Sequence, residues 1–243
     1  AKSMAAGQKN EQMQHNLEHL LEDIHKRAED AGREPEEINL IVVTKEKPAL
    51  VIKQLTELGQ LKIGESYLQE ALFKMELLAD IPIEWHMIGH IQHGKERQVV
   101  RHFDVVHSID RLSLAKKMNL EAEKADRKIP IFAECNVSGE ETKYGFPAWK
   151  DEQWNQLVDE IGQLLELEQL PLKGLMTMAP YAEDPERARP YFVRLRDIRD
   201  QLQEEFPRSN LAELSMGMSG DYRVAVEEGA TYLRIGSAIV GPR

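Results

Sequence analysis

Two hydrophobic patterns alternate along the chain. In the first, apolar residues recur every three or four positions, as in an amphipathic helix. Near the N-terminus these residues are Met13, Leu17, Leu20, Leu21, Ile24 and Ala28. In the second, short runs rich in apolar and β-branched residues predict buried strands. We expect these strands over Ile38–Thr44, Leu61–Glu65, Trp85–Ile91, Val105–Ile109, Pro130–Val137, Leu172–Met178, Glu213–Met218 and Tyr232–Val240.

Helical spacing returns between the strands. The clearest stripe comprises Trp154, Leu157, Val158, Ile161, Leu164 and Leu165. Strands that alternate with helices indicate a parallel sheet, and eight of them fit a (β/α)₈ TIM-type barrel, which typically has about 250 residues. An open doubly wound sheet is the alternative, although it usually has fewer strands. No Gly-, Ser- or Pro-rich linker interrupts the pattern, so residues 1–243 are expected to form one domain, with Ala1–Ser3 before Met4 resembling a cloning remnant.

Charge and composition exclude several classes of protein. The chain has 31 Lys and Arg against 42 Asp and Glu, a net charge of −11, which disfavours nucleic acid as a partner. The clearest apolar run, Leu40–Val43, is far shorter than the ~20 residues of a membrane-spanning helix, so no membrane partner is expected. A single cysteine, Cys135, and the lack of a recognisable signal peptide predict a reducing, cytoplasmic location.

The first predicted strand is followed directly by a lysine. TIM-barrel active sites lie at the C-terminal ends of the strands, so Lys45 is expected near the barrel mouth. Apolar surroundings would lower the pKa of its amine, and an unprotonated amine can form a Schiff base with a carbonyl. The alternative is a rim lysine paired with Glu46. Lys47 is a rival candidate, and Pro48 after it predicts a loop that leads into the next helix.

Two segments rich in small residues lie at the end of the seventh predicted strand and within the eighth. They are Ser215–Gly220 and Arg234–Ser237, placed where barrels commonly bind phosphate. Small residues allow backbone N–H groups to approach an anion, and the start of a helix adds a favourable dipole. The alternative is ordinary turn and capping chemistry, in which Ser219 is a helix N-cap.

The histidines and methionines do not predict a metal site. His86 and His90 would lie about 13 Å apart on one strand, too far for one ion bound at about 2 Å. These histidines, with His93, His102 and His107, are therefore expected in the core or at the rim. Buried packing is expected for Cys135 and for the methionines Met176, Met178, Met216 and Met218.

Seven short motifs occur in order along the chain: Val43–Pro48, Gly64–Glu70, Trp85–Gly89, Asn136–Glu140, Gly174–Pro180, Leu214–Ser219 and Arg234–Ser237. Together they resemble the pyridoxal-phosphate homeostasis protein family, which is similar to the N-terminal barrel of alanine racemase. The resemblance extends over about residues 36–241. It implies a barrel that holds pyridoxal 5′-phosphate as an internal aldimine on Lys45.

The same resemblance assigns further contacts to the cofactor. It implies that Arg234 faces the pyridine nitrogen and that the phosphate is bound by Ser219, Gly236 and Ser237. Ser66 and Met218 complete the expected cofactor-binding set. The chain departs from the family pattern at Ser66, where an asparagine is usual, and at Gly94, which replaces another common asparagine.

The favoured interpretation is a carrier and regulator of pyridoxal phosphate with no catalytic residue. We expect it to be a monomer with pyridoxal-phosphate-dependent apoenzymes as partners, although the sequence names no physiological acceptor of the cofactor. An amino-acid racemase is the main alternative. Racemases of this type add a C-terminal β-domain and use a second subunit, whereas this chain ends at Arg243, just after the last predicted strand. A Schiff-base aldolase without cofactor is the third possibility. Visible absorbance distinguishes the aldolase from the carrier and the racemase, because only a pyridoxal aldimine is yellow. A racemisation assay then separates the carrier from the racemase.

Overall fold

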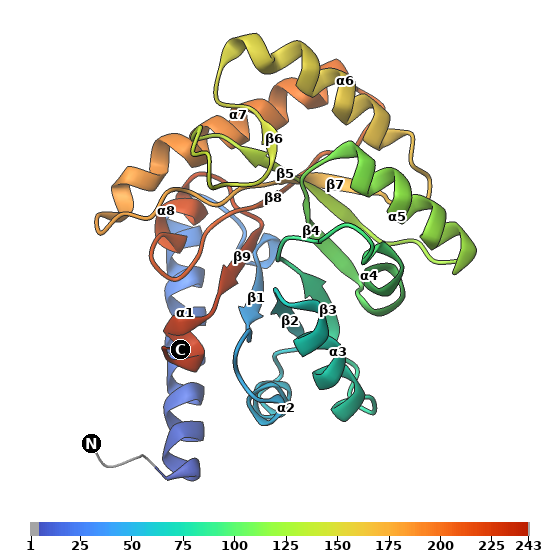
Figure 1. The fold of residues 1–243 in the computed structure, drawn as a ribbon. Coiled ribbons are helices and arrows are strands. Elements are labelled where there is room, and N and C mark those ends of the chain that lie inside the picture. Colours follow the sequence, from blue (N-terminus) through green and yellow to red (C-terminus); the bar gives the residue numbers. More distant parts are fainter. Residues whose placement is uncertain (1–4, 243) are drawn as a thin grey trace.

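Parallel strands form the centre of the molecule. The structure, a computed structural model, describes residues 5–242, and within them the strands follow the order β1–β2–β3–β4–β5–β7–β8–β9, with β9 paired to β1 (Figure 1). Every pairing is parallel, so the predicted closed barrel is confirmed. The barrel strands are β1 (Asn39–Val43), β2 (Lys62–Glu65), β3 (Glu84–Met87), β4 (Val105–Ile109), β5 (Ile131–Asn136), β7 (Leu172–Met176), β8 (Glu213–Ser215) and β9 (Tyr232–Ile235).

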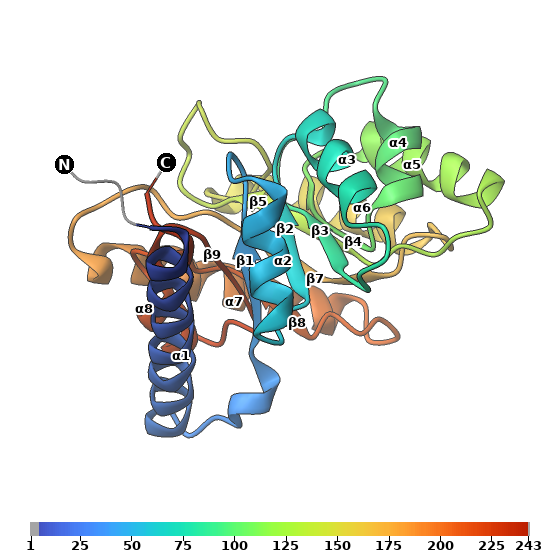
Figure 2. The same ribbon diagram turned by 90° about the horizontal axis from the view of Figure 1, so that it is seen from below.

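Helices surround the barrel and connect its strands (Figures 1 and 2). The α-helices are α1 (Ala6–Asp30), α2 (Ala49–Glu57), α3 (Leu68–Leu77), α4 (Glu96–His102), α5 (Leu112–Lys124), α6 (Trp154–Leu165), α7 (Arg189–Glu205), α8 (Tyr222–Glu227) and α9 (Ser237–Val240). Short 3₁₀ turns occupy Pro35–Glu37, Asp151–Gln153 and Pro185–Ala188. Among the described residues, no helix is both long and apolar enough to cross a bilayer.

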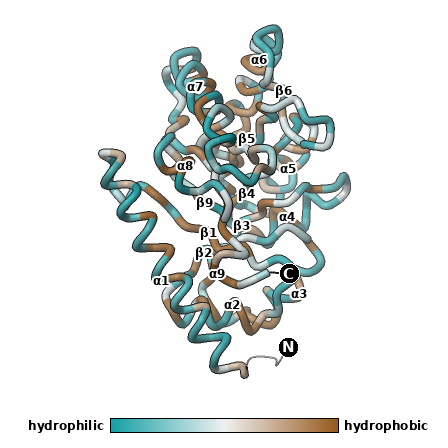
Figure 3. The backbone as a smooth tube through the Cα atoms, turned by 90° about the vertical axis from the view of Figure 1, so that its left-hand side faces the viewer, coloured by the Kyte–Doolittle hydropathy of each residue, from teal (hydrophilic) through white to brown (hydrophobic). Residues whose placement is uncertain are grey.

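The N-terminal helix α1 packs along α8 and α9 (Figure 1). Hydrophobic and hydrophilic residues alternate along it in Figure 3, and the apolar stripe predicted from the sequence is buried except for Leu21, which is 44% exposed. Polar contacts add to this packing. Asp23 accepts hydrogen bonds from Tyr222 and from Arg223 Nε, the latter at 2.8 Å. Asn16 Nδ2 donates to the Ile239 carbonyl at 3.1 Å.

Several predicted strands extend too far at their C-terminal ends. The strands starting at Trp85, Leu172, Glu213 and Tyr232 end at Met87, Met176, Ser215 and Ile235, and Ser237–Val240 is helical. Residues beyond these ends, such as Ile91 and Met216, are buried in the mouth loops, so their apolar character does not report strand pairing. The two-residue strand β6 (Phe146–Pro147), paired with β5, is too short to give a periodic signal.

The predicted buried packing is partly confirmed. Met176 and Met216 are buried, Met178 is half-buried, and Met218 is 37% exposed, so its predicted core role is wrong. Met218 lies in the loop after β8, where its backbone N–H donates to Asp221 Oδ1 at 2.7 Å. Cys135 is buried as predicted, and burial raises the pKa of its thiol to about 12.

Candidate functional site

A cleft of about 600 Å³ opens at the C-terminal ends of the barrel strands. Lys45 and Ser66 line one part of it, just beyond β1 and β2, and Glu134 and Met178 line another, at β5 and beyond β7. Tyr144 also contributes, with its ring stacked on His90 at a centroid distance of 3.7 Å. The cleft therefore lies at the mouth where barrel enzymes bind small molecules, and its size suits a cofactor-sized ligand.

The peptide group that precedes Lys45 is held by a buried ion pair. Lys74 Nζ donates to the Thr44 carbonyl at 2.8 Å and to both carboxylate oxygens of Glu65 at 3.0 Å. The Thr44 hydroxyl also donates to Glu65. All three side chains are buried, and burial raises the pKa of Glu65 against the opposing effects of Thr44 and Lys74. This cluster fixes the end of β1, and with it the direction in which Lys45 leaves the strand.

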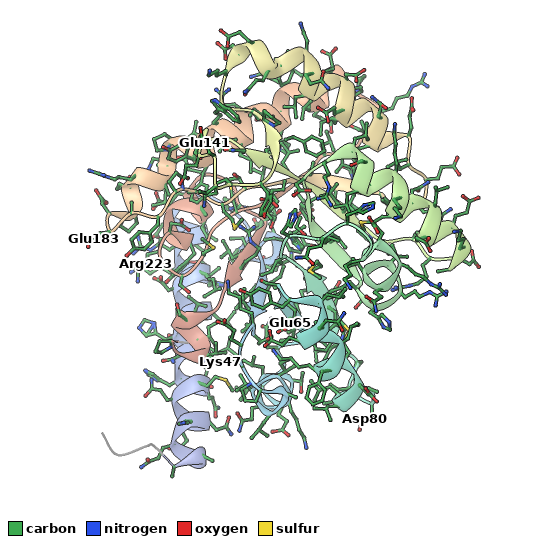
Figure 4. All side chains as sticks on the ribbon, in the orientation of Figure 1. Lys47, Glu65, Asp80, Glu141, Glu183 and Arg223 are labelled. Carbon is green, nitrogen blue, oxygen red and sulfur yellow. The ribbon has the colours of Figure 1, made fainter. Side chains whose placement is uncertain are left out.

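The residues that follow Lys45 are also held. The Glu46 backbone N–H donates to Glu70 Oε1 at 2.6 Å, and Glu46 adopts a φ of 64°, which is uncommon for a residue with a side chain. Lys47 Nζ donates to the Pro242 carbonyl at 2.7 Å. In Figure 4 Lys47 accordingly lies beside the C-terminal segment, whereas Glu65 lies beside α3. Lys47 is therefore engaged away from the cleft that Lys45 lines.

The two segments predicted to bind phosphate meet in the structure. Ser219 Oγ accepts a hydrogen bond from the Ala238 backbone N–H at 3.2 Å, which joins the loop after β8 to the start of α9. A Cβ added to Gly236 would lie 3.2 Å from the Val43 carbonyl, so this segment packs against the end of β1. Gly236 thus lies beside β1, and Ser219 contacts the helix that follows Gly236. None of Ser219, Gly236 and Ser237 lines the 600 Å³ cleft.

The structure corrects the alternative interpretation of Ser219 as a helix N-cap. Helix α8 begins at Tyr222, and Asp221 is the residue before it. Asp221 Oδ1 accepts the Met218 backbone N–H at 2.7 Å and so closes the turn. The Ser219 hydroxyl oxygen instead accepts the Ala238 backbone N–H at the start of α9.

Arg234 is buried inside the barrel, on β9. Its Nη1 donates to Ser215 Oγ at 2.6 Å and its Nη2 donates to the Thr177 carbonyl at 2.9 Å. Burial lowers the pKa of Arg234 to about 10, against the effect of Glu134 and Asp221, so the guanidinium remains charged at neutral pH. Burial, with Asp110 nearby, raises the pKa of Glu134 to about 7.

Sequence reasoning missed the pairing of Glu65 with Lys74. The signal was present, because Ala71, Lys74 and Leu78 are spaced by three and four residues and all three are buried. A lysine on the apolar face of a helix needs a buried partner. The described residues contain no group of three or more histidine, cysteine or acidic side chains arranged to hold a metal ion.

Comparisons with known proteins agree with this architecture. The family model of the alanine racemase N-terminal domain matches residues 11–243. The pyridoxal phosphate homeostasis protein of Aquifex aeolicus is 41% identical over 227 residues, covering 93% of this chain and 96% of that protein. The protein of the same name from Escherichia coli K12 is 35% identical over 238 residues, covering 94% of this chain and 96% of that protein.

Solved structures give the same picture. PipY of Synechococcus elongatus, in a structure with PLP bound, is 34% identical with a TM-score of 0.78, covering 90% of this chain and 100% of that one. Its structure without PLP has a TM-score of 0.80. An alanine racemase of Clostridium difficile has a TM-score of 0.70 at 17% identity, covering 96% of this chain and 57% of that one, and shares the fold.

Proposed function

Because this chain belongs to the pyridoxal phosphate homeostasis protein family, we propose that it binds pyridoxal 5′-phosphate through a Schiff base on Lys45. It acts as a cytoplasmic, monomeric, single-domain carrier that supplies the cofactor to apoenzymes and has little or no turnover of its own. The observation that carries the proposal is Lys45 in the cleft at the barrel mouth, in a chain 34% identical to PipY with PLP bound.

The residues at the mouth fit this cofactor. Its phosphate is a dianion, for which Ser219 and Ser237 supply hydroxyl groups and the neighbouring backbone supplies N–H groups. Its aldehyde carbon would form a C=N bond to the Lys45 amine, with loss of water. The cleft volume of about 600 Å³ lies within the range of small-molecule sites.

Arg234 supplies the reason for low turnover. A guanidinium only donates hydrogen bonds, so Arg234 would bind a pyridine nitrogen that carries no proton. Pyridoxal phosphate stabilises carbanions best when that nitrogen is protonated. The chain's own arginine therefore favours retention of the cofactor over chemistry on amino acids.

Purified protein is expected to turn yellow with pyridoxal phosphate and to show no appreciable racemase, transaminase or decarboxylase turnover. Absorption spectra and assays with a panel of amino acids check both parts. Turnover at ordinary enzyme rates of ~1–10³ s⁻¹ would contradict the carrier function and favour a racemase. A colourless protein that reacts with carbonyl substrates would favour the aldolase alternative.

The double variant Ser219→Ala/Ser237→Ala is expected to bind pyridoxal phosphate at least tenfold more weakly. Each hydroxyl bonded to the phosphate contributes about 1.5 kcal/mol. Affinities for pyridoxal phosphate and for unphosphorylated pyridoxal, measured by titration of the visible band, check this, with pyridoxal affinity expected to stay unchanged. An unaltered affinity for the phosphorylated form would refute the assignment of these serines.

A further inference from the structure

A line of polar side chains crosses the barrel interior from Arg234 to Glu84. Arg234 Nη1 lies 2.6 Å from Ser215 Oγ, which lies 2.8 Å from His107 Nδ1. His107 Nε2 lies 2.8 Å from His86 Nδ1. His86 Nε2 makes no hydrogen bond and lies 3.4 Å from Glu84 Oε2, an ionic contact only. The first four residues are buried, whereas the Glu84 side chain is 42% exposed at the start of β3. The line thus runs from the interior to the end of the barrel opposite the cleft.

The charged groups at the two ends limit which way the hydrogen bonds between them can run. A guanidinium only donates, so Ser215 Oγ accepts from Arg234. An ionised carboxylate only accepts, so the His86 nitrogen that faces Glu84 carries a proton. With a neutral His86, Nδ1 accepts His107 Nε2–H, and His107 Nδ1 accepts the Ser215 hydroxyl proton. An imidazolium at His86 would reverse these two bonds, because its Nδ1–H would donate to His107 Nε2.

The surroundings of His107 favour the neutral form of its own ring. The ring stacks on Phe132 at a centroid distance of 4.4 Å and meets the Tyr232 ring edge-on, so aromatic side chains cover it. Burial, with His86 and Arg234 nearby, holds the pKa of His107 well below its usual value. The contact with His86 and the field of Lys62 hold the pKa of Glu84 low, so this carboxyl stays ionised.

We propose that His107, His86 and Glu84 are positioning residues for Arg234. Because His107 Nδ1 accepts the hydrogen bond from the Ser215 hydroxyl, the lone pairs of the Ser215 oxygen stay available to Arg234. Nη2 donates a second hydrogen bond to the Thr177 carbonyl, and the two bonds together fix the plane of the guanidinium. Its remaining N–H groups therefore point in a defined direction. This inference rests on the proposed function in one respect, that Arg234 faces the cofactor's ring nitrogen.

The proton positions are tested on the protein without cofactor. Nitrogen-15 NMR of the imidazole rings at neutral pH is expected to show both His107 and His86 as neutral rings protonated at Nε2. Ser215→Ala breaks the line while removing a single oxygen, and it is expected to change the His107 signals. Ser215→Thr, which keeps a hydroxyl, restores them. Ser108→Ala, the matched loss of a buried barrel hydroxyl that donates to the Gly89 carbonyl, leaves both histidines unchanged.

A proton on Nδ1 of either ring, or a charged imidazole at neutral pH, overturns the assignment. With pyridoxal phosphate added, Ser215→Ala is expected to shift the visible band and to weaken binding roughly tenfold, with recovery in Ser215→Thr. An unchanged band and affinity overturn the positioning role. Failure of the wild-type protein to bind pyridoxal phosphate refutes the proposed function instead, since the NMR arm needs no cofactor.

Discussion

Lys45→Ala is expected to abolish the visible band and the covalent adduct that borohydride reduction fixes to the chain. The proposed Schiff base has one attachment atom, the Lys45 amine, so its removal leaves only the non-covalent contacts. Absorption spectra and intact mass after reduction measure the loss. The fold is expected to remain, because Lys45 lies beyond the end of β1 rather than within the sheet.

Lys47→Ala is the matched control. Its amine is bonded to the Pro242 carbonyl at 2.7 Å, so the adduct and the band should survive its removal. The opposite pattern, with the adduct lost in Lys47→Ala and kept in Lys45→Ala, would show that the attachment has been assigned to the wrong lysine.

Lys74→Met is expected to destabilise the protein by about 3–5 kcal/mol, because it leaves Glu65 buried without its cationic partner. Urea unfolding measures the change. Lys53→Met, at an exposed position on α2, is the control and should stay within about 0.5 kcal/mol of the wild type. The double variant Lys74→Met/Glu65→Gln should recover part of the loss. A loss of less than about 1 kcal/mol in Lys74→Met would show that the Glu65–Lys74 ion pair contributes little to the free energy of unfolding.

The loss in Lys74→Met should grow with pH. Burial already raises the folded-state pKa of Glu65, so the folded protein holds this proton at a pH where the unfolded chain has released it. Stability from this group therefore falls as pH rises from the unfolded pKa through the folded one. Removing Lys74 raises the folded pKa further and widens that window.

The sequence was sufficient to predict the barrel because the alternation of helical stripes and short apolar runs repeats along the chain. It could not give the strand ends. Ile91 and Met216 are as apolar as strand residues, yet they fill the mouth loops. A Cβ added to Gly89 would lie 2.2 Å from the Ser66 carbonyl, so the chain has already turned away from the sheet there. Contacts of this kind form between the segments that follow neighbouring strands, so the sequence of one segment alone does not indicate them.

The site was predictable where it depends on position along one strand, and not where it depends on neighbours across the barrel. Lys45 was located because it follows a clear strand. The partner of His86 was not found, because comparison with His90 along the same strand could not show that His107, on the next strand, lies 2.8 Å away. The roles of Ser66, Met218 and the phosphate-binding residues stay predictions.

Closure of the barrel has a consequence for how the protein folds. Strand β1 acquires its second neighbour only when β9 arrives, and the contact between Asn39 and Thr231 spans 192 positions. Long-range contacts of this kind form slowly, since the entropy of closing the intervening loop must be overcome before the contact stabilises anything. During synthesis, Lys45 leaves the ribosome early, whereas β9 and the proposed phosphate-binding residues after it emerge only when the chain is almost complete. We therefore expect cofactor binding only after the ring has closed.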